Sequence, residues 1–331
     1  MPGMHGNFTA VNAMQEADLL VALGTRFDDR VTDGLDGVSP STPRSSTSTS
    51  TRPSWARSSS ARRPSWATRR LVIEDMVKCC RRSAVPTPSP GSQRLEATAV
   101  GLARALPLTY ENVEAGEGHV KPQYVLERLR SLAPSDTIVA SGVGQHQMWT
   151  SQYWKFNHPY TCVNSGGLGT MGFSIPAAIG AKVGRPDRMV WAVDGDGCFQ
   201  MTAQELVTAS AERIPIKVAI LNNAYLGNIR QWQEMFYDER YSEVYLSPDL
   251  PDYVKWSEAM GCVAMRVEST DEVDAAIEKA NSINDRPVVI EFPHRCTREG
   301  VRWCSAGKTN SEAAVDPTQQ PDLDRLRSLG R

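Results

Sequence analysis

Between residues 120 and 292, apolar runs typical of β-strands alternate with segments whose apolar residues recur at helical spacing. This alternation predicts an α/β fold with a parallel sheet flanked by helices, because parallel strands need long crossover connections. Ligands of such sheets bind beyond the carboxyl ends of the strands. The strand candidates are residues 137–143, 189–193, 217–221, 263–267 and 287–292, and the helix candidates are residues 122–132, 172–183, 202–213, 252–260 and 273–282.

Two polar elements follow successive strands of this predicted sheet. Gly195-Asp196-Gly197 comes one residue after the strand MVWAV, and Asn222-Asn223 comes directly after the strand KVAIL. If these strands are neighbours, a carboxylate and a carboxamide meet at one sheet edge, where they can hold an oxygen-preferring ion such as Mg²⁺. The glycines let a phosphate group approach the backbone, and a following helix N-terminus favours its negative charge. The plain alternative is a tight turn at the glycines and a helix cap at Asn223.

The GDG and NN elements, with 24 residues between them, resemble the signature of thiamine-diphosphate (ThDP) enzymes. Longer segments are similar to the large catalytic subunit of the acetohydroxyacid synthase (acetolactate synthase) family. They are LLVALGTRFDDRVT, GVGQHQMW, NSGGLGTMGFSIPAAIGAK, GDGCFQMTAQELVTA and IPIKVAILNNAYLGNIRQWQEMFYDERY. The resemblance covers roughly residues 1–38 and 106–292. It implies decarboxylation of pyruvate and carboligation to a second 2-ketoacid, pyruvate or 2-ketobutyrate, in branched-chain amino-acid biosynthesis.

The resemblance also implies three cofactors, which are ThDP, Mg²⁺ and FAD. The side chains of Asp196 and Asn223 and the backbone carbonyl of Tyr225 would bind Mg²⁺. Met201 would hold ThDP in its bent form, and Trp232 would form the wall that selects the second 2-ketoacid. The remaining ThDP contacts would be Gln145 and His146 at the diphosphate, Gly169, Thr170 and Met171 at the pyrimidine, and Gly166, Gly195, Gly197, Leu226 and Gly227. The FAD contacts would be Gly3, Met4, His5, Gly24, Arg26, Phe27 and Asp28.

Several of these residues have simpler interpretations. Met201 at a helix start could belong to the core, and Trp232 on an amphipathic helix could serve packing. His146 could be a capped loop histidine, and Asp28 could lie in a solvated turn. Asn228 departs from the family, which usually has a methionine after LG, so a polar amide would face an apolar surface there.

A competing motif is GLGTMG at residues 167–172, which satisfies the dinucleotide-binding pattern G-x-G-x-x-G. A nicotinamide site would need a strand before the motif and an acidic residue at the end of the next strand. Residues 161–164 form only a short strand candidate, and Asp187 precedes the next strand instead of following it. The glycines therefore fit better as a loop against the flat ring of ThDP.

The resemblance divides the chain into three parts. Residues 1–105 would be a partial central, flavin-type α/β domain, with a helix over 7–17 and a buried strand over 18–27. Residues 106–292 would be the ThDP diphosphate-binding domain, and residues 293–331 a poorly ordered tail. In the family a preceding domain supplies the glutamate that activates the cofactor. We expect this chain, as a truncated fragment without that glutamate, to be inactive alone.

Two stretches of the first part and residues 293–304 do not resemble the rest. Residues 40–70 carry seven arginines, no acid, and no Leu, Ile, Val, Met or Phe, so they cannot bury enough apolar surface to order themselves. Residues 79–104 are similar. Disordered linkers or compensating frameshifts would each explain them, and translation of the coding DNA in the other frames separates the two. In either case we expect weak FAD binding.

Charge and composition limit the classes of partner and the cellular location that we expect. The 36 Lys+Arg nearly balance the 38 Asp+Glu, so we expect neither nucleic acid nor a membrane as partner. No apolar run reaches the roughly 18 residues of a membrane span. The seven cysteines lack zinc or disulfide spacing, which favours a reducing cytoplasm. The family implies a homodimer or tetramer with a regulatory small subunit. Alternatives are another ThDP enzyme, such as glyoxylate carboligase or pyruvate oxidase, and a non-catalytic fragment.

Overall fold

The computed structural model describes residues 5–6, 8–17, 20–23, 45–48, 63–65, 69–82, 100–101, 108, 110, 119–246, 249 and 251–295. The chain divides into two compact units, one of Met1–Leu108 with Arg302–Arg331 and the other of Thr109–Val301. Of the expected FAD contacts, only His5 falls within the described residues. Gly3, Met4, Gly24, Arg26, Phe27 and Asp28 lie outside them.

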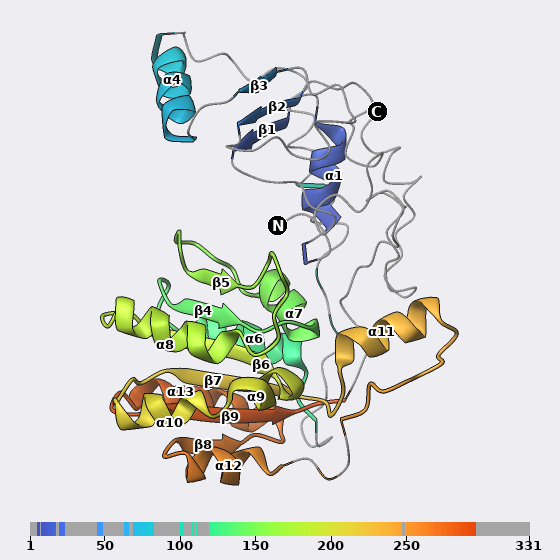
Figure 1. Ribbon diagram of the computed structural model, residues 1–331, viewed down its shortest axis with the longest axis vertical. Coiled ribbons are helices and arrows are strands. Elements are labelled where there is room, and N and C mark those ends of the chain that lie inside the picture. The colour runs from blue at the N-terminus through green and yellow to red at the C-terminus, as the bar shows by residue number, and fades with distance from the viewer. Residues whose placement is uncertain are drawn as a thin grey trace. The chain divides into compact units, whose positions relative to one another are not determined.

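The larger unit is built on a six-stranded sheet with the order β5-β4-β6-β7-β9-β8, in which every neighbouring pair is parallel (Figure 1). The predicted α/β class with a parallel sheet is therefore confirmed. β6 and β7 lie side by side in the middle, with Gly195 paired to Leu221 at their carboxyl ends. The strands are β4 (Ile138–Ser141), β5 (Cys162–Asn164), β6 (Val190–Gly195), β7 (Lys217–Asn222), β8 (Val263–Arg266) and β9 (Val288–Pro293).

Helices cover both faces of this sheet (Figure 1). On one face the buried side chains of Ile175, Phe199 and Leu206 pack against the strands. On the other face the Trp191 indole donates a hydrogen bond to Asn281 Oδ1 at 3.2 Å. The first face carries α8 (Ser174–Gly184), α9 (Asp196–Thr202), α10 (Glu205–Ala211) and α12 (Tyr253–Ala259), and the second carries α6 (Pro122–Leu132), α7 (Gln145–Tyr153) and α13 (Val273–Ser282).

Most predicted helices occur close to their expected bounds, but one is divided. Instead of a single helix over 202–213, α9 ends at Thr202 and α10 begins at Glu205. The Leu206 amide bonds to the Ala203 carbonyl at 2.9 Å, and this tighter three-residue step redirects the chain. Two further elements, α11 (Gly227–Phe236) and the 3₁₀ helix η1 (Thr270–Glu272), complete the larger unit.

The described residues of the smaller unit include a parallel three-stranded sheet with the order β1-β2-β3. The expected helix over 7–17 corresponds to α1, and the expected strand corresponds to β1. That strand was predicted to be buried, which is wrong at Val21 and Leu23, because they lie on an edge strand of a small sheet and are 42% and 41% exposed. The elements are α1 (Phe8–Glu16), β1 (Leu20–Leu23), β2 (Ser45–Ser48), β3 (Arg63–Ser65) and α4 (Arg69–Arg82).

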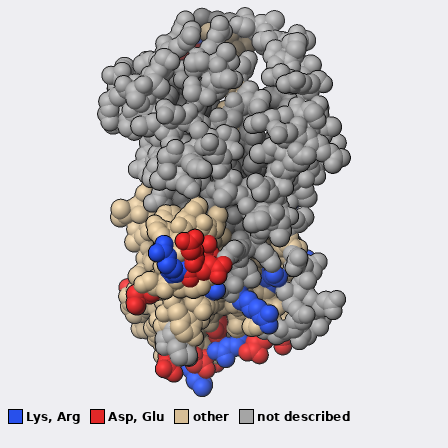
Figure 2. Space-filling model, turned by 90° about the vertical axis from the view of Figure 1, so that its right-hand side faces the viewer, with Lys and Arg blue, Asp and Glu red and all other residues tan. Residues whose placement is uncertain are grey.

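The strands β2 and β3 and the first two residues of α4, Arg69 and Arg70, fall within residues 40–70, which we expected to be disordered, and the other residues of that stretch lie outside the described residues. The same helix extends over residues 79–82, the start of the second such stretch. The described part of one face shows Lys and Arg intermixed with Asp and Glu (Figure 2). Among the described residues, no helix has both the length and the apolar character that crossing a membrane requires.

Candidate functional site

The carboxyl ends of β6 and β7 bring Asp196 and Asn223 together. Asp196 is the first residue of α9, directly after β6, and is only 2% exposed. Its carboxyl group lies near the backbone amides of Asp196 and Gly197 in α9 and of Ala224 and Asn223 at the end of β7. Burial raises the pKa of Asp196 to about 7, and these amides oppose the rise. Its Oδ2 atom is buried without a hydrogen-bond partner, so it can accept a cation.

The turn after β7 is fixed by its own side chains. Asn222 Oδ1 accepts a hydrogen bond from the Ala224 amide, and Asn223 Oδ1 accepts one from the Tyr225 amide, each at 3.0 Å. Such Asx turns stabilise irregular backbone. Ala224 adopts φ 60°, a left-handed conformation that costs a residue with a Cβ about 1–2 kcal/mol. The local hydrogen bonds offset that cost and present the Asn223 and Tyr225 backbone at the sheet edge.

A buried acid supports this turn from the next strand. Glu291 on β9 is 3% exposed, and its Oε1 atom accepts a hydrogen bond from Asn222 Nδ2 at 2.7 Å. Its Oε2 atom accepts a hydrogen bond from Arg266 Nε at 2.8 Å. Glu291 therefore links the turn to β8, although neither Glu291 nor Arg266 was among the predicted site residues. A single acid inside the apolar run VVIEF was the available signal, because buried acids need partners.

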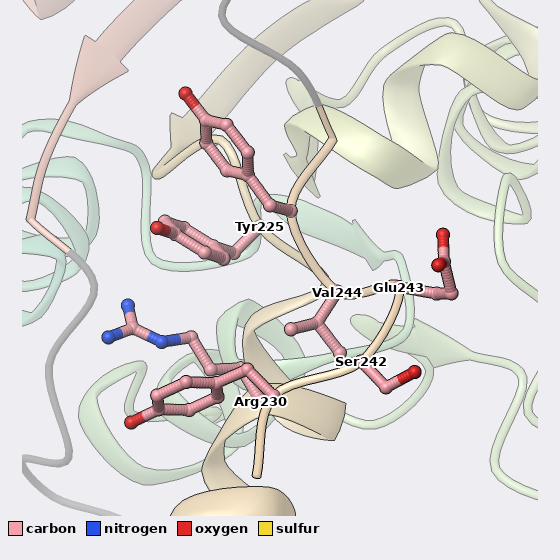
Figure 3. A pocket seen from close by; sticks show the side chains of 7 residues that line it. Tyr225, Arg230, Ser242, Glu243 and Val244 are labelled. Atoms are coloured by element: carbon pink, nitrogen blue, oxygen red, sulfur yellow. The ribbon is translucent and has the colours of Figure 1, made fainter. Parts of the chain in front are cut away.

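The two ends of the segment that contains α11 are joined by backbone hydrogen bonds, which form its base. The Leu226 amide bonds to the Val244 carbonyl at 2.8 Å, and the Leu246 amide bonds to the Ala224 carbonyl at 2.9 Å. A cavity of about 290 Å³ opens beside this base, lined by Tyr225, Arg230 and residues 241–245 (Figure 3). The Arg230 guanidinium lies 4.4 Å from the centre of the Tyr225 ring, within range of a cation–π contact.

Gln145 and His146 begin α7, just after β4. Both are buried, and Gln145 Nε2 donates a hydrogen bond to Gln231 Oε1 at 3.4 Å. A Cβ placed on Gly227 would lie 2.2 Å from Gln145 Oε1 and 2.9 Å from Asn223 Nδ2, so all three residues converge. Burial lowers the pKa of His146 to about 3, which keeps its imidazole neutral.

The loop between β5 and α8 approaches the same sheet edge. The Thr170 amide donates a hydrogen bond to Ser165 Oγ at 3.0 Å, and Gly169 adopts φ 75°, which favours glycine. A Cβ on Gly197 would lie 3.5 Å from Met171 Cε and 3.2 Å from Leu226 Cδ2, so these two apolar side chains flank Gly197.

The remaining predicted residues of the larger unit are more exposed. Gly166 is an exposed loop residue. Met201 is 55% exposed and lies beside Gly172, where a Cβ would come within 2.9 Å of Met201 Cβ, so Met201 is not a core residue. Trp232 on α11 is 38% exposed. His146 lies in a helix and not in a loop, which removes the loop interpretation of that residue.

The strand order argues against a nicotinamide site at residues 167–172. A short strand, β5, does precede the glycine motif. However, β4 lies between β5 and β6, so the acidic residues at the end of β6 are not at the neighbouring strand end that a dinucleotide ribose requires.

Comparison with known proteins agrees with the geometry. Residues 142–292 match the family described as "Thiamine pyrophosphate enzyme, C-terminal TPP binding domain". The chain is 44% identical to the acetolactate synthase of Mycobacterium leprae over 332 residues, which cover 98% of this chain and 52% of that protein. The chain belongs to the acetolactate synthase family.

Two further members of this family show how widely the similarity extends. The acetolactate synthase large subunit of Corynebacterium glutamicum is 44% identical over 98% of this chain and 51% of its own length. The mitochondrial acetolactate synthase catalytic subunit of Saccharomyces cerevisiae is 37% identical over 88% of this chain and 42% of its own length. The chain thus spans about half the length of the curated relatives it matches.

Proposed function

We propose that this chain carries the diphosphate-binding part of an acetolactate synthase and binds ThDP together with Mg²⁺. The observation that carries the proposal is the meeting of Asp196 with the Asn223 backbone at adjacent strand ends. Asp196 Oδ2, buried and without a hydrogen-bond partner, suits an oxygen-preferring cation. Asp196, Asn223 and the Tyr225 carbonyl would hold Mg²⁺. When bound, ThDP supplies the carbon-acid chemistry by which a 2-ketoacid loses CO₂ and joins a second 2-ketoacid.

The other residues around this edge would position ThDP and the substrates. Gln145 and His146 would contact the diphosphate, and neutral His146 can donate one hydrogen bond and accept another. Met171 and Leu226, on either side of Gly197, would provide an apolar surface for the cofactor rings. Gly166, Gly169, Thr170, Gly195 and Gly227 would let the cofactor approach the backbone. The exposed positions of Met201 and Trp232 leave both side chains available to ligand and substrate.

The family context completes the proposal. The substrates would be pyruvate and either a second pyruvate or 2-ketobutyrate, the assembly would be a homodimer or tetramer with a regulatory small subunit, and the location would be the cytoplasm. FAD would bind to the smaller unit, with His5 among its contacts. Product analysis by mass spectrometry separates acetolactate formation from the reactions of glyoxylate carboligase and pyruvate oxidase.

Binding of ThDP tests the cofactor proposal directly. Isothermal titration calorimetry of the full chain should show ThDP binding that depends on Mg²⁺. Asp196→Asn should weaken that binding at least about tenfold, as loss of a metal contact does. Asp187→Asn is the matched control, because Asp187 precedes the amino end of the same strand and pairs with Arg185 at the surface. Equal binding by the two variants, or no ThDP binding by the unmodified chain, would contradict the proposal.

A second experiment tests the activity. Acetolactate formation from pyruvate would be measured for the chain alone and after addition of the separately produced N-terminal half of the Mycobacterium leprae relative. We expect activity in the mixture that Asp196→Asn abolishes and Asp187→Asn retains. A mixture that binds ThDP but forms no acetolactate would contradict the proposed reaction while leaving the cofactor site intact.

A further inference from the structure

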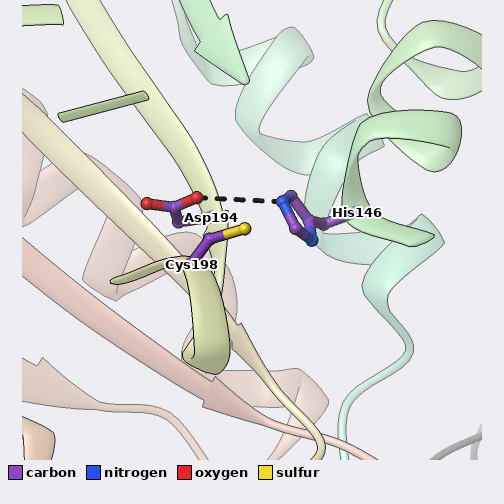
Figure 4. A group of neighbouring side chains, drawn as sticks. All are labelled: His146, Asp194 and Cys198. Atoms are coloured by element: carbon purple, nitrogen blue, oxygen red, sulfur yellow. Dashed lines mark ion pairs between the residues drawn. The ribbon is translucent and has the colours of Figure 1, made fainter. Parts of the chain in front are cut away.

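Three side chains that can bind a metal ion lie close together near the carboxyl end of β6 (Figure 4). They are His146 from α7, Asp194 from β6 and Cys198 from α9. His146 Nε2 lies 3.7 Å from Asp194 Oδ1, and the three ligating atoms all lie within 4.8 Å of one another. Bonds of about 2.0–2.3 Å to Zn²⁺ place its ligand atoms somewhat closer than this, so only small side-chain movements are required.

Two atoms of this cluster are left without hydrogen bonds. His146 Nε2 and Asp194 Oδ1 are both buried and have no hydrogen-bond partner. The other carboxylate oxygen of Asp194 accepts a hydrogen bond from Ser174 Oγ, and the Cys198 thiol donates one to the Val143 carbonyl at 3.1 Å. Buried polar atoms are normally satisfied, so these two exceptions, which face each other, point to a ligand between them.

The backbone around the cluster keeps this space open. A Cβ on Gly142 would lie 2.0 Å from Asp194 Oδ1 and 2.7 Å from His146 Nε2. A Cβ on Gly195 would lie 2.9 Å from His146 Nδ1. Glycine at these two positions is therefore what allows the imidazole and the carboxylate to lie together between β4 and β6. The cluster is an enclosed site and not a chance grouping of surface residues.

We propose that His146, Asp194 and Cys198 bind a divalent cation of the Zn²⁺ class, at a site separate from the Mg²⁺ site proposed for Asp196 and Asn223. Nitrogen, oxygen and sulfur together suit Zn²⁺ or Co²⁺, whereas Mg²⁺ prefers oxygen alone. On binding, the Cys198 thiol releases its proton to solvent, and the thiolate and the carboxylate then neutralise the charge of the ion.

One consequence of this site rests on the proposed function. If His146 contacts the ThDP diphosphate, an ion bound to His146 should lower the affinity for ThDP. The site itself does not depend on that function, because it is defined by its own three ligands. Failure of ThDP binding would leave the cation site unaffected, and failure of cation binding would leave the ThDP proposal unaffected.

Titration of the purified full chain with Co²⁺ tests the site, because a Co²⁺–thiolate bond gives a near-ultraviolet charge-transfer band. We expect a saturable band that excess Mg²⁺ does not remove. C198S should abolish it, and D194N, which retains the thiol, should weaken Co²⁺ binding at least about tenfold. C262S is the matched control, because Cys262 is also buried but precedes β8, an edge strand that β7 and β9 separate from β6.

The adjacent exposed cysteines of α4 provide a second control. The band should persist when Cys79 and Cys80 are both replaced by serine. The proposal is wrong if the unmodified chain gives no band, if C198S keeps it, or if only the Cys79 and Cys80 replacement removes it. If circular dichroism shows that C198S does not fold, the D194N variant is the deciding test. Unchanged Co²⁺ affinity in D194N would then show that the proposed cation site is wrong.

Discussion

The buried carboxylate of Glu291 should contribute measurably to the stability of the turn that carries Asn223. Glu291→Gln keeps an oxygen for Asn222 Nδ2, but it replaces the charged acceptor of Arg266 with an amide. A hydrogen bond to a charged group contributes about 1.5–3 kcal/mol. Because the Arg266 side chain is 37% exposed, water weakens this pair, and we expect a loss of about 1–2 kcal/mol.

The loss should appear as a lower urea midpoint with an unchanged slope, followed by far-ultraviolet circular dichroism. Asp187→Asn again serves as the control, because Asp187 and Arg185 make an Arg–carboxylate pair of nearly the same length, 2.7 Å, on the surface. We expect no measurable change from that control. A double-mutant cycle with Arg266→Met then isolates the pairwise contribution.

Glu291→Gln should also weaken the proposed Mg²⁺ site, because Asn222 connects Glu291 to the turn that carries Asn223. An amide oxygen accepts a weaker hydrogen bond from Asn222 Nδ2 than the carboxylate does, so the left-handed backbone of Ala224 is less well held, and we expect Mg²⁺-dependent ThDP affinity to fall about tenfold. The reasoning is refuted if Glu291→Gln changes neither stability nor affinity, or if it and the Asp187 control behave alike.

Three further outcomes are expected. Gly142→Ala should cost about 1–3 kcal/mol in urea unfolding, because its Cβ would meet Asp194 Oδ1, whereas Gly180→Ala, in open space on α8, should stabilise by about 0.5–1 kcal/mol. Asn228→Met should raise stability by about 1 kcal/mol, because Asn228 Oδ1 is buried without a partner, and an unchanged urea midpoint would contradict this. Burial lowers the pKa of Lys217 from 10.5 to about 8, so between these values the unfolded chain binds more protons. Stability of the unmodified chain relative to Lys217→Met should therefore rise with pH across that range, and a flat or falling difference would refute the assignment.

The sequence predicted the parts of this fold that depend on local pattern. Apolar runs located the main strands of the larger sheet, and the βαβ unit formed by β6, its helices and β7 placed Asp196 beside Asn223. The helix α7 was not predicted, because it is buried on nearly all sides and so lacks the apolar stripe of a surface helix.

Features that depend on contacts between distant parts of the sequence could not be predicted. The position of β4 between β5 and β6 follows from packing and not from any local signal. The support given by Glu291 depends on the register of β7 with β9, which pairs Ile220 with Glu291 and so brings the carboxylate near Asn222. The His146–Asp194–Cys198 cluster likewise required three separate elements to be placed in space.

The backbone hydrogen bonds of Leu226 and Leu246, at the base of the α11 segment, mark where this segment can be exchanged between members of the family. They join the two ends of the intervening stretch, so α11 and Trp232 form an insert that leaves and rejoins the scaffold at nearly one point. If Trp232 selects the second 2-ketoacid, as the family resemblance implies, exchanging residues along the insert between relatives should change that preference without disturbing the turn at Asn223. Chimaeras joined at residues 226 and 244 should keep their cation affinity while acquiring the substrate range of the donor.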